Sequence, residues 1–261
     1  MAAGPLAGRL FWLTRPEGQN APVQAALEAQ GAQVLCVPLL RIEALPPTPQ
    51  MRETIQQLDR YSLLFYVSAN AVKIGLDRIF DWWPQYPEGI TNFAVGSGTA
   101  AVLQARGLGV YYPSERMTSE ALLELPQLQH VAGKRALIVR GVGGREVMAR
   151  SLRERGCQVD YLELYRRMLP PHPPEHLASM LSDTFPDAVV LSSADAMDNL
   201  VTLFAPLGDQ WRTLPLVVAS ERLRQHALLL GFAEVRCLEN ASDAAIIAGL
   251  CDSFGQEPSH V

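Results

Sequence analysis

The stretch GRLFWLTRPEGQNAPVQAALEAQGAQVLCVPLLRI, which runs from Gly8 to Ile42, returns later in the chain in a similar form. Its counterpart is GKRALIVRGVGGREVMARSLRERGCQVDYLELYRRM, from Gly133 to Met168. The offset is 125 positions at each of five matched pairs: Gly8 and Gly133, Arg15 and Arg140, Leu27 and Leu152, Gly31 and Gly156, and Val34 and Val159. One constant offset over so many positions indicates an internal repeat.

Two further blocks extend this repeat. Leu64 to Phe80 matches Val189 to Phe204, with Ser68 and Ser193 again 125 positions apart. In the third block we align Ser97 with Ser220 and Ser119 with Ser242, an offset of 123. This alignment predicts an indel of two residues between the second and third blocks.

Each block is typical of a strand followed by a turn and a helix. Leu10 to Thr14 forms an apolar strand, Pro16 suits a helix start, and Gly31 ends the helix before a second strand at Gln33 to Val37. Several strands are apolar throughout instead of alternating: Ala136 to Val139, Ala188 to Leu191, and Leu216 to Val218. Such strands are typical of parallel sheets covered by helices on both faces, so the predicted class is α/β.

Proline-rich stretches at equivalent repeat positions predict two crossings between domains. They are Pro38 to Pro49 and Leu164 to Pro174. We expect linkers at residues 39–44 and 164–171, and one α/β domain at 45–163. The other α/β domain is discontinuous and joins 1–38 to 172–261. A cleft spanned by two antiparallel linkers is expected between the domains.

Composition excludes several classes of protein. No run approaches the roughly 20 apolar residues that span a bilayer, and no signal-like segment is present. The four cysteines show neither disulfide spacing nor a zinc pattern. The net charge is −5 without a basic block, which argues against a nucleic-acid partner. We expect a soluble cytoplasmic protein that has no membrane partner.

Six strand-to-helix turns carry small, hydroxyl-bearing or arginine residues. In open parallel sheets, ligands bind beyond the carboxyl ends of the strands, where helix N-termini present free N–H groups. Each turn taken alone is explained by helix capping. The six together predict binding of anions through backbone N–H groups and two arginines. The turns are Thr14 to Pro16, Ser68 to Asn70, Gly96 to Thr99, Arg140 to Gly144, Ser192 to Ala194, and Ala219 to Glu221.

Common catalytic and nucleotide-binding patterns fail. Gly141 to Gly144 does not complete a dinucleotide fingerprint, and no phosphate-loop lysine, GxSxG or HExxH pattern is present. Tyr165 stands out because it occupies the repeat position of Leu40, on the second linker facing the expected cleft. A tyrosine there could brace the linker, or its phenol could donate a proton to a leaving group.

The assembled residues resemble the uroporphyrinogen-III synthase family over nearly the whole chain. The stretches that carry the resemblance are Leu13 to Pro16 with Gln19, Gly31 and Pro38 to Ile42; Val67 to Val72; Ala94 to Gly96 with Thr99 and Ala100; Ser119 to Leu122; Arg140 and Gly141 with Gly144 to Glu146; and Tyr165 to Arg167. The turn at Ser220 and Glu221 departs from the threonine that family members often carry.

The resemblance implies two flavodoxin-like domains joined by a two-stranded linker, and a lyase that needs neither cofactor nor metal. Such an enzyme of tetrapyrrole and heme biosynthesis removes the terminal hydroxyl of linear hydroxymethylbilane. The substituted position of the last pyrrole ring then attacks the resulting azafulvene. A spirocyclic intermediate then fragments and recloses with that ring inverted, which gives uroporphyrinogen III. The main task of such an enzyme is to hold the substrate in one conformation.

The resemblance assigns Tyr165 as the catalytic residue that assists departure of the hydroxyl. The turns supply the expected groups for the acetate and propionate carboxylates: Arg15, Ser68, Asn70, Gly98, Thr99, Arg140, Gly141, Ser192, Ser193 and Ser220. We expect a monomer, and allow for a transient contact with the preceding bilane-forming enzyme. Two alternatives stay open: a two-domain small-anion binding or sensor protein without catalysis, and a nucleotide-dependent transferase.

Overall fold

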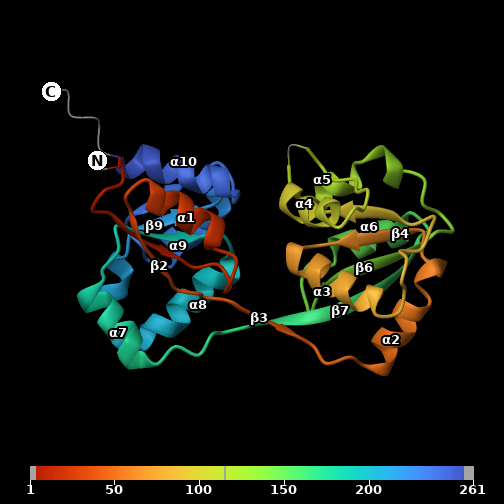
Figure 1. The fold of residues 1–261 in the computed structure, drawn as a ribbon, viewed down its shortest axis with the longest axis horizontal. Coiled ribbons are helices and arrows are strands. Elements are labelled where there is room, and N and C mark those ends of the chain that lie inside the picture. The colour runs from red at the N-terminus through yellow and green to blue at the C-terminus, as the bar shows by residue number, and fades with distance from the viewer. Residues whose placement is uncertain (1–3, 115, 256–261) are drawn as a thin grey trace. The chain divides into compact units, whose positions relative to one another are not determined.

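A computed structural model describes residues 4–114 and 116–255. The chain divides into two compact units, residues 1–41 with 168–261, and residues 42–167. Each unit is built on a five-stranded sheet with helices around it (Figure 1). The predicted α/β class is therefore confirmed. No helix within the described ranges combines the length and the apolar character that a membrane span requires.

The sheet of the first unit is parallel, with the strand order β10-β9-β8-β1-β2. Its strands are β1 (Leu10–Leu13), β2 (Gln33–Cys36), β8 (Ala188–Leu191), β9 (Leu216–Val218) and β10 (Val235–Cys237). Counted from β1 along the chain, this is the order 2-1-3-4-5 of flavodoxin-like folds. The order reverses between β1 and β8.

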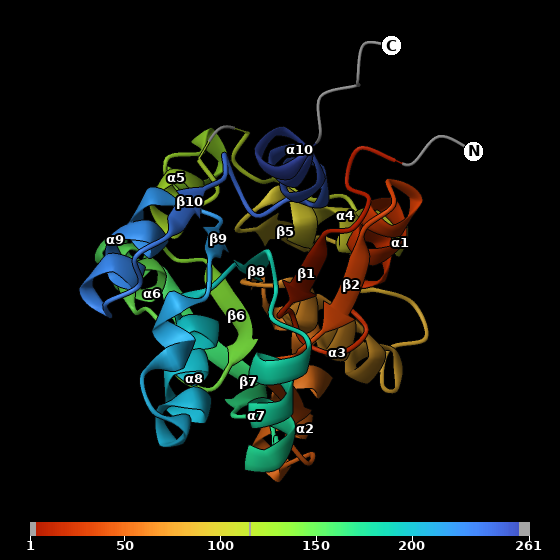
Figure 2. The ribbon, with the colours of Figure 1, turned by 90° about the vertical axis from the view of Figure 1, so that its left-hand side faces the viewer.

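Helices cover both faces of this sheet because nearly every strand residue is apolar. Phe11 and Leu13 point into one core with α1 (Ala21–Ala29) and α10 (Asp243–Phe254). Trp12 points into the opposite core, which holds the other three helices (Figure 2). These are α7 (Pro174–Asp183), α8 (Ala194–Phe204) and α9 (Glu221–Leu229). The period of two along each strand thus divides the core into two layers.

The second unit has the strand order β3-β7-β6-β4-β5. Its strands are β3 (Arg41–Ala44), β4 (Leu63–Tyr66), β5 (Thr91–Ala94), β6 (Arg135–Gly141) and β7 (Gln158–Met168). The pairs β4–β5, β4–β6 and β6–β7 are parallel. At the outer edge, the Leu45 N–H donates to the Leu164 carbonyl at 2.8 Å. Strand residues therefore occupy much of the two segments that the prolines predict to be linkers.

The second sheet is also buried on both faces. Leu64 and Tyr66 point into a core with α2 (Pro49–Gln56), α3 (Ala69–Phe80) and α4 (Ser97–Ala105). Leu63 and Phe65 point into the opposite core, with α5 (Ser119–Leu123) and α6 (Val147–Glu154). The strand order β7-β6-β4-β5 repeats β2-β1-β8-β9 of the first unit. The chain enters this fold at a different point, so the second unit is a circular permutation of the first.

Strand registers correct the alignment of the third repeat block. Leu64 lies beside Asn92, and its repeat partner Val189 lies beside Leu216. Asn92 and Leu216 are thus structurally equivalent at an offset of 124.

Helix caps give the same offset. Gly96 and Ser220 cap α4 and α9, while Thr118 and Ser242 cap α5 and α10. Pairing Ser97 with Ser220 and Ser119 with Ser242 was wrong by one position. The alignment matched serine to serine, but glycine and threonine also serve as helix caps. The indel between the second and third blocks is therefore one residue long.

Candidate active site

Two serines at equivalent repeat positions hold the starts of two helices. Ser68 follows β4, and its Oγ accepts the Ala71 N–H at 3.0 Å. Ser193 follows β8, and its Oγ accepts the Ala196 N–H at 3.2 Å. Both serines have extended backbones, which is the usual geometry of a residue that caps a helix. Each cap satisfies one N–H group of the first turn, and each helix start is the positive end of a helix dipole, which favours an anion.

The remaining turn residues lie at other helix starts of the two units. Ser220 caps α9 by accepting the Leu223 N–H at 3.3 Å. Gly98 and Thr99 lie in the first turn of α4, where Gly96 caps without a side chain. Asn70 lies in the first turn of α3, and Ser192 directly precedes the Ser193 cap. Gly98 is exposed, and a Cβ added there would meet no atom within 4 Å.

Tyr165 lies on β7 inside the second unit. Only 1 % of the residue is exposed, and the side chain belongs to the core beside α3. Its Oη lies 2.8 Å from Ser68 Oγ. The ring packs so closely on Gly141 that a Cβ at position 141 would lie 2.6 Å from a ring carbon. Tyr165 was expected on a linker; its ring packs into the core of the second unit, because it stands at an inward position of β7.

Arg140 is buried and bound within its own unit. It is 5 % exposed, its Nη2 donates to the Gly143 carbonyl, and its Nη1 lies 3.0 Å from Glu146 Oε1. Its guanidinium also lies over the Tyr161 ring, 4.8 Å from the centroid. Arg140 thus shapes the loop from Gly141 to Glu146 and does not point its donors toward solvent.

Arg15, the repeat partner of Arg140, has different contacts. Its Nη1 lies 2.5 Å from Asp243 Oδ1, and its Nη2 donates to the Ala241 carbonyl at 2.6 Å. Its side chain keeps 18 % exposure. Arg15 and Ser192 line one small cavity of the first unit. This unit therefore brings two of the predicted binding residues together.

The predicted site residues divide between the two units. Arg15, Ser192, Ser193 and Ser220 belong to the first unit, and the others to the second: Ser68, Asn70, Gly98, Thr99, Arg140, Gly141 and Tyr165. Direct contacts join Tyr165 to Ser68 and to Gly141. Among the described residues, no group of three or more histidine, cysteine, aspartate or glutamate side chains could hold a metal ion.

Sequence reasoning gave no role to Glu146 and Tyr161. The Tyr161 hydroxyl donates to Glu146 Oε2, while Glu146 Oε1 accepts from Arg140. The Tyr161 and Arg140 hydrogen bonds lower the pKa of the Glu146 carboxyl. A glutamate six residues after an arginine carries no pattern that would predict this contact. Only the fold of the glycine-containing loop brings the three side chains together.

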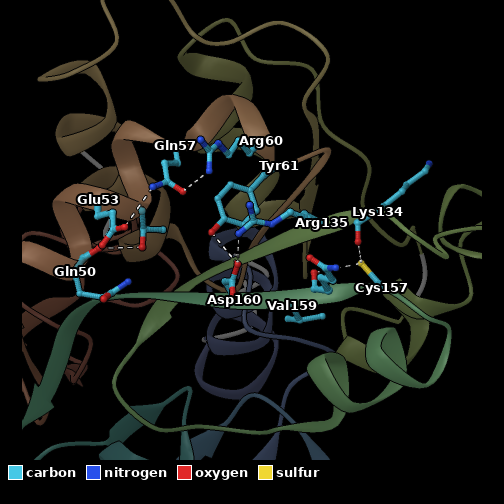
Figure 3. Close-up of polar contacts among 12 residues, drawn as sticks. Gln50, Glu53, Gln57, Arg60, Tyr61, Lys134, Arg135, Cys157, Val159 and Asp160 are labelled. Atoms are coloured by element: carbon cyan, nitrogen blue, oxygen red, sulfur yellow. Dashed lines mark hydrogen bonds and ion pairs between the residues drawn. The ribbon is translucent and has the colours of Figure 1, made fainter.

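The second unit has another polar cavity, of about 300 Å³, beside α2 and β7. There Asp160 accepts from Tyr61 and from Arg135, each at 2.9 Å (Figure 3). Burial and the Asp160 carboxylate raise the pKa of Tyr61 to about 12. Arg135 and Asp160 form an ion pair, so the arginine that lines this cavity is already bound to a carboxylate. None of the predicted site residues lines it.

Sequence comparisons with known proteins point to one family. The sequence model described as uroporphyrinogen-III synthase HemD matches residues 21–248. Uroporphyrinogen-III synthase of Escherichia coli is 32 % identical over 91 % of this chain and 98 % of its own length. The Synechococcus elongatus protein of that name is 31 % identical over 95 % of this chain and 97 % of its own length.

Solved structures match the fold. A mutant uroporphyrinogen III synthase of Thermus thermophilus aligns over 94 % of this chain and 98 % of its own, with a TM-score of 0.59 and 20 % identity. The Helicobacter pylori synthetase aligns over 94 % and 99 %, with a TM-score of 0.58 and 15 % identity. Together with the family match over most of the length, these findings establish that the chain belongs to the uroporphyrinogen-III synthase family.

Proposed function

We propose that this chain cyclises hydroxymethylbilane to uroporphyrinogen III, with Tyr165 and the helix N-termini of both units as its working groups. The observation that carries the proposal is the family match across residues 21–248. The activity is that of the family, a cyclising lyase of tetrapyrrole biosynthesis. This reading is favoured over an anion sensor, because the curated relatives that match most of the chain are named as the synthase.

The turns supply the chemistry that the substrate needs. The acetate and propionate carboxylates of the bilane are anions, and a helix start offers N–H groups and the positive end of a helix dipole. Ser68, Ser193 and Ser220 each begin such a helix. Backbone N–H groups bind carboxylates without a basic surface, which suits a chain with a net charge of −5. We place the carboxylates at these helix starts.

Arg15 and Arg140 contribute to binding in different ways. Arg15 keeps partial exposure, so its ion pair with Asp243 leaves it close enough to solvent to meet a carboxylate. Arg140 holds the loop around Gly143 instead, and acts on the substrate through the shape of that loop. We further infer that the protein works as a monomer in the cytoplasm, and that segments 39–44 and 164–171 link its two domains.

Isomer analysis tests the function. Freshly generated hydroxymethylbilane is incubated with the protein, the products are oxidised, and the type I and type III isomers are separated by chromatography. We expect type III in proportion to the amount of protein. A heat-denatured sample supplies the control, because the bilane closes spontaneously to type I. Formation of type I alone by folded protein would overturn the proposal.

A further inference from the structure

The hydroxyl groups of Ser68 and Tyr165 form a pair with unequal access to solvent. Ser68 Oγ and Tyr165 Oη lie 2.8 Å apart, and Ser68 Oγ also accepts the Ala71 N–H at 3.0 Å. Tyr165 is 1 % exposed, whereas Ser68 is only partly buried. A ligand that approaches the end of β4 therefore meets Ser68 before it meets the phenol.

Counting hydrogens fixes which group can donate outward. A serine hydroxyl has one hydrogen and two acceptor positions. The Ala71 N–H occupies one acceptor position of Ser68. If Tyr165 donates into the second, the phenol hydrogen is satisfied and the serine hydrogen is left to donate to a ligand. The reverse arrangement leaves the phenol hydrogen without a partner in the described structure, inside a core where an unmade hydrogen bond is costly.

The helix start strengthens this arrangement. Ser68 caps α3, which spans Ala69–Phe80, so the positive end of a three-turn helix dipole lies at its Oγ. An N–H and a phenol O–H that both donate to one hydroxyl oxygen polarise its remaining O–H bond. The Ser68 hydrogen thus becomes a stronger donor than that of an isolated serine.

We propose that Ser68 donates the proton to the departing hydroxyl of the bilane, and that Tyr165 acts behind it by passing its own proton to Ser68. The carbon–oxygen bond breaks and its electron pair leaves with the oxygen. That oxygen takes the Ser68 hydrogen and departs as water, while the Tyr165 hydrogen moves to Ser68 Oγ. The pyrrole N–H proton that is lost as the azafulvene forms goes to Ser68 Oγ, whose own hydrogen returns to Tyr165 Oη and restores the phenol. Protons and electrons balance without a further reactant.

This inference rests on the proposed function and makes a distinct kinetic prediction. Groups that act in series lose their effect together. We expect Ser68→Ala and Tyr165→Phe each to lower kcat by roughly 100-fold, a typical loss for a proton-transfer group. The double variant should be no slower than either single variant. KM should change little, because we place the carboxylates on the backbone N–H groups of the helix starts and not on the Ser68 hydroxyl. Ser68→Thr, which keeps a hydroxyl and a cap, should retain most of kcat.

Thr48→Ala is the matched control for the lost cap. Thr48 caps α2 of the same unit by accepting the Met51 N–H at 3.1 Å, and it is not one of the proposed site residues. This variant should keep the kcat of the wild-type protein. If Ser68→Ala also kept it while Tyr165→Phe lost it, the phenol would be the direct donor and the inference would fail. Losses that multiply in the double variant would likewise overturn it.

The wild-type protein provides a test that needs no substitution. Single-turnover rates are measured in mixtures of H₂O and D₂O. Two hydrogens that move together give a curved dependence on the deuterium fraction, and one hydrogen gives a straight line. A straight line would overturn the relay even if type III is formed. Failure to form type III at all would instead remove the proposed function.

Discussion

The two units share a strand order, but they differ in the residue at the β7 position that contacts the capping serine Ser68 in the second unit. Ser68 and Ser193 lie 125 positions apart, and each accepts the N–H three residues on. The position behind Ser68 is Tyr165, and its repeat partner in the other unit is Leu40. The repeat thus supplies one scaffold twice, and one aromatic replacement gives the second unit a hydroxyl pair that the first unit cannot form.

A second difference accompanies the first. Gly141 packs against the Tyr165 ring, whereas its repeat partner is Pro16. A larger side chain at one position therefore goes with the smallest residue at the other. This comparison indicates that Tyr165 and Gly141 function as a unit, and it can be tested from either side.

The largest effect on stability is expected from Gly141→Ala. The added Cβ would lie 2.6 Å from the Tyr165 ring, so the ring or the strand must move. Overpacking of this kind costs about 1–3 kcal/mol, and we expect the upper part of that range. Urea unfolding measures the loss. Gly98→Ala is the control, because its Cβ would meet no atom within 4 Å. Equal stability of the two variants would show that the Tyr165 ring leaves room for a Cβ at position 141.

A smaller effect is expected at the two arginines, and it should be unequal. Arg140→Met removes the buried guanidinium that holds Gly143 and Glu146, at a cost of about 2 kcal/mol. Arg15→Met breaks an ion pair in which Asp243 is 44 % exposed, so the expected cost is below about 1 kcal/mol. Unfolding midpoints of both variants make the comparison. Equal losses of stability in the two variants would contradict the inference that Arg140, unlike Arg15, holds a loop in place.

The hydrophobic pattern and the internal repeat predicted the fold, because strands that are buried on both faces consist of consecutive apolar residues. Ser68, Ser193 and Ser220 were predicted at helix starts, since hydroxyl residues after an apolar strand are typical caps. The burial of Tyr165 could not be predicted, because a proline-rich neighbourhood resembles an exposed linker. The partners of Arg140 were also beyond prediction, since they depend on a loop in which Gly143 has a φ of 74° and Gly144 one of 104°.

The smallest effect concerns pH and the carboxylate of that loop. Hydrogen bonds from Tyr161 and then Arg140 lower the pKa of Glu146 below its ordinary value of 4.5, whereas the repeat partner of Glu146 is Ala21. Since the pKa is lower in the folded state, the ionised carboxylate stabilises the protein above the unfolded pKa. That contribution disappears as pH falls through the folded pKa. Glu146→Gln should therefore be less stable than the wild-type protein at pH 7, and the gap in urea midpoint should narrow on acidification. A gap that stays constant down to pH 3 would mean that the charge of Glu146 does not hold the loop.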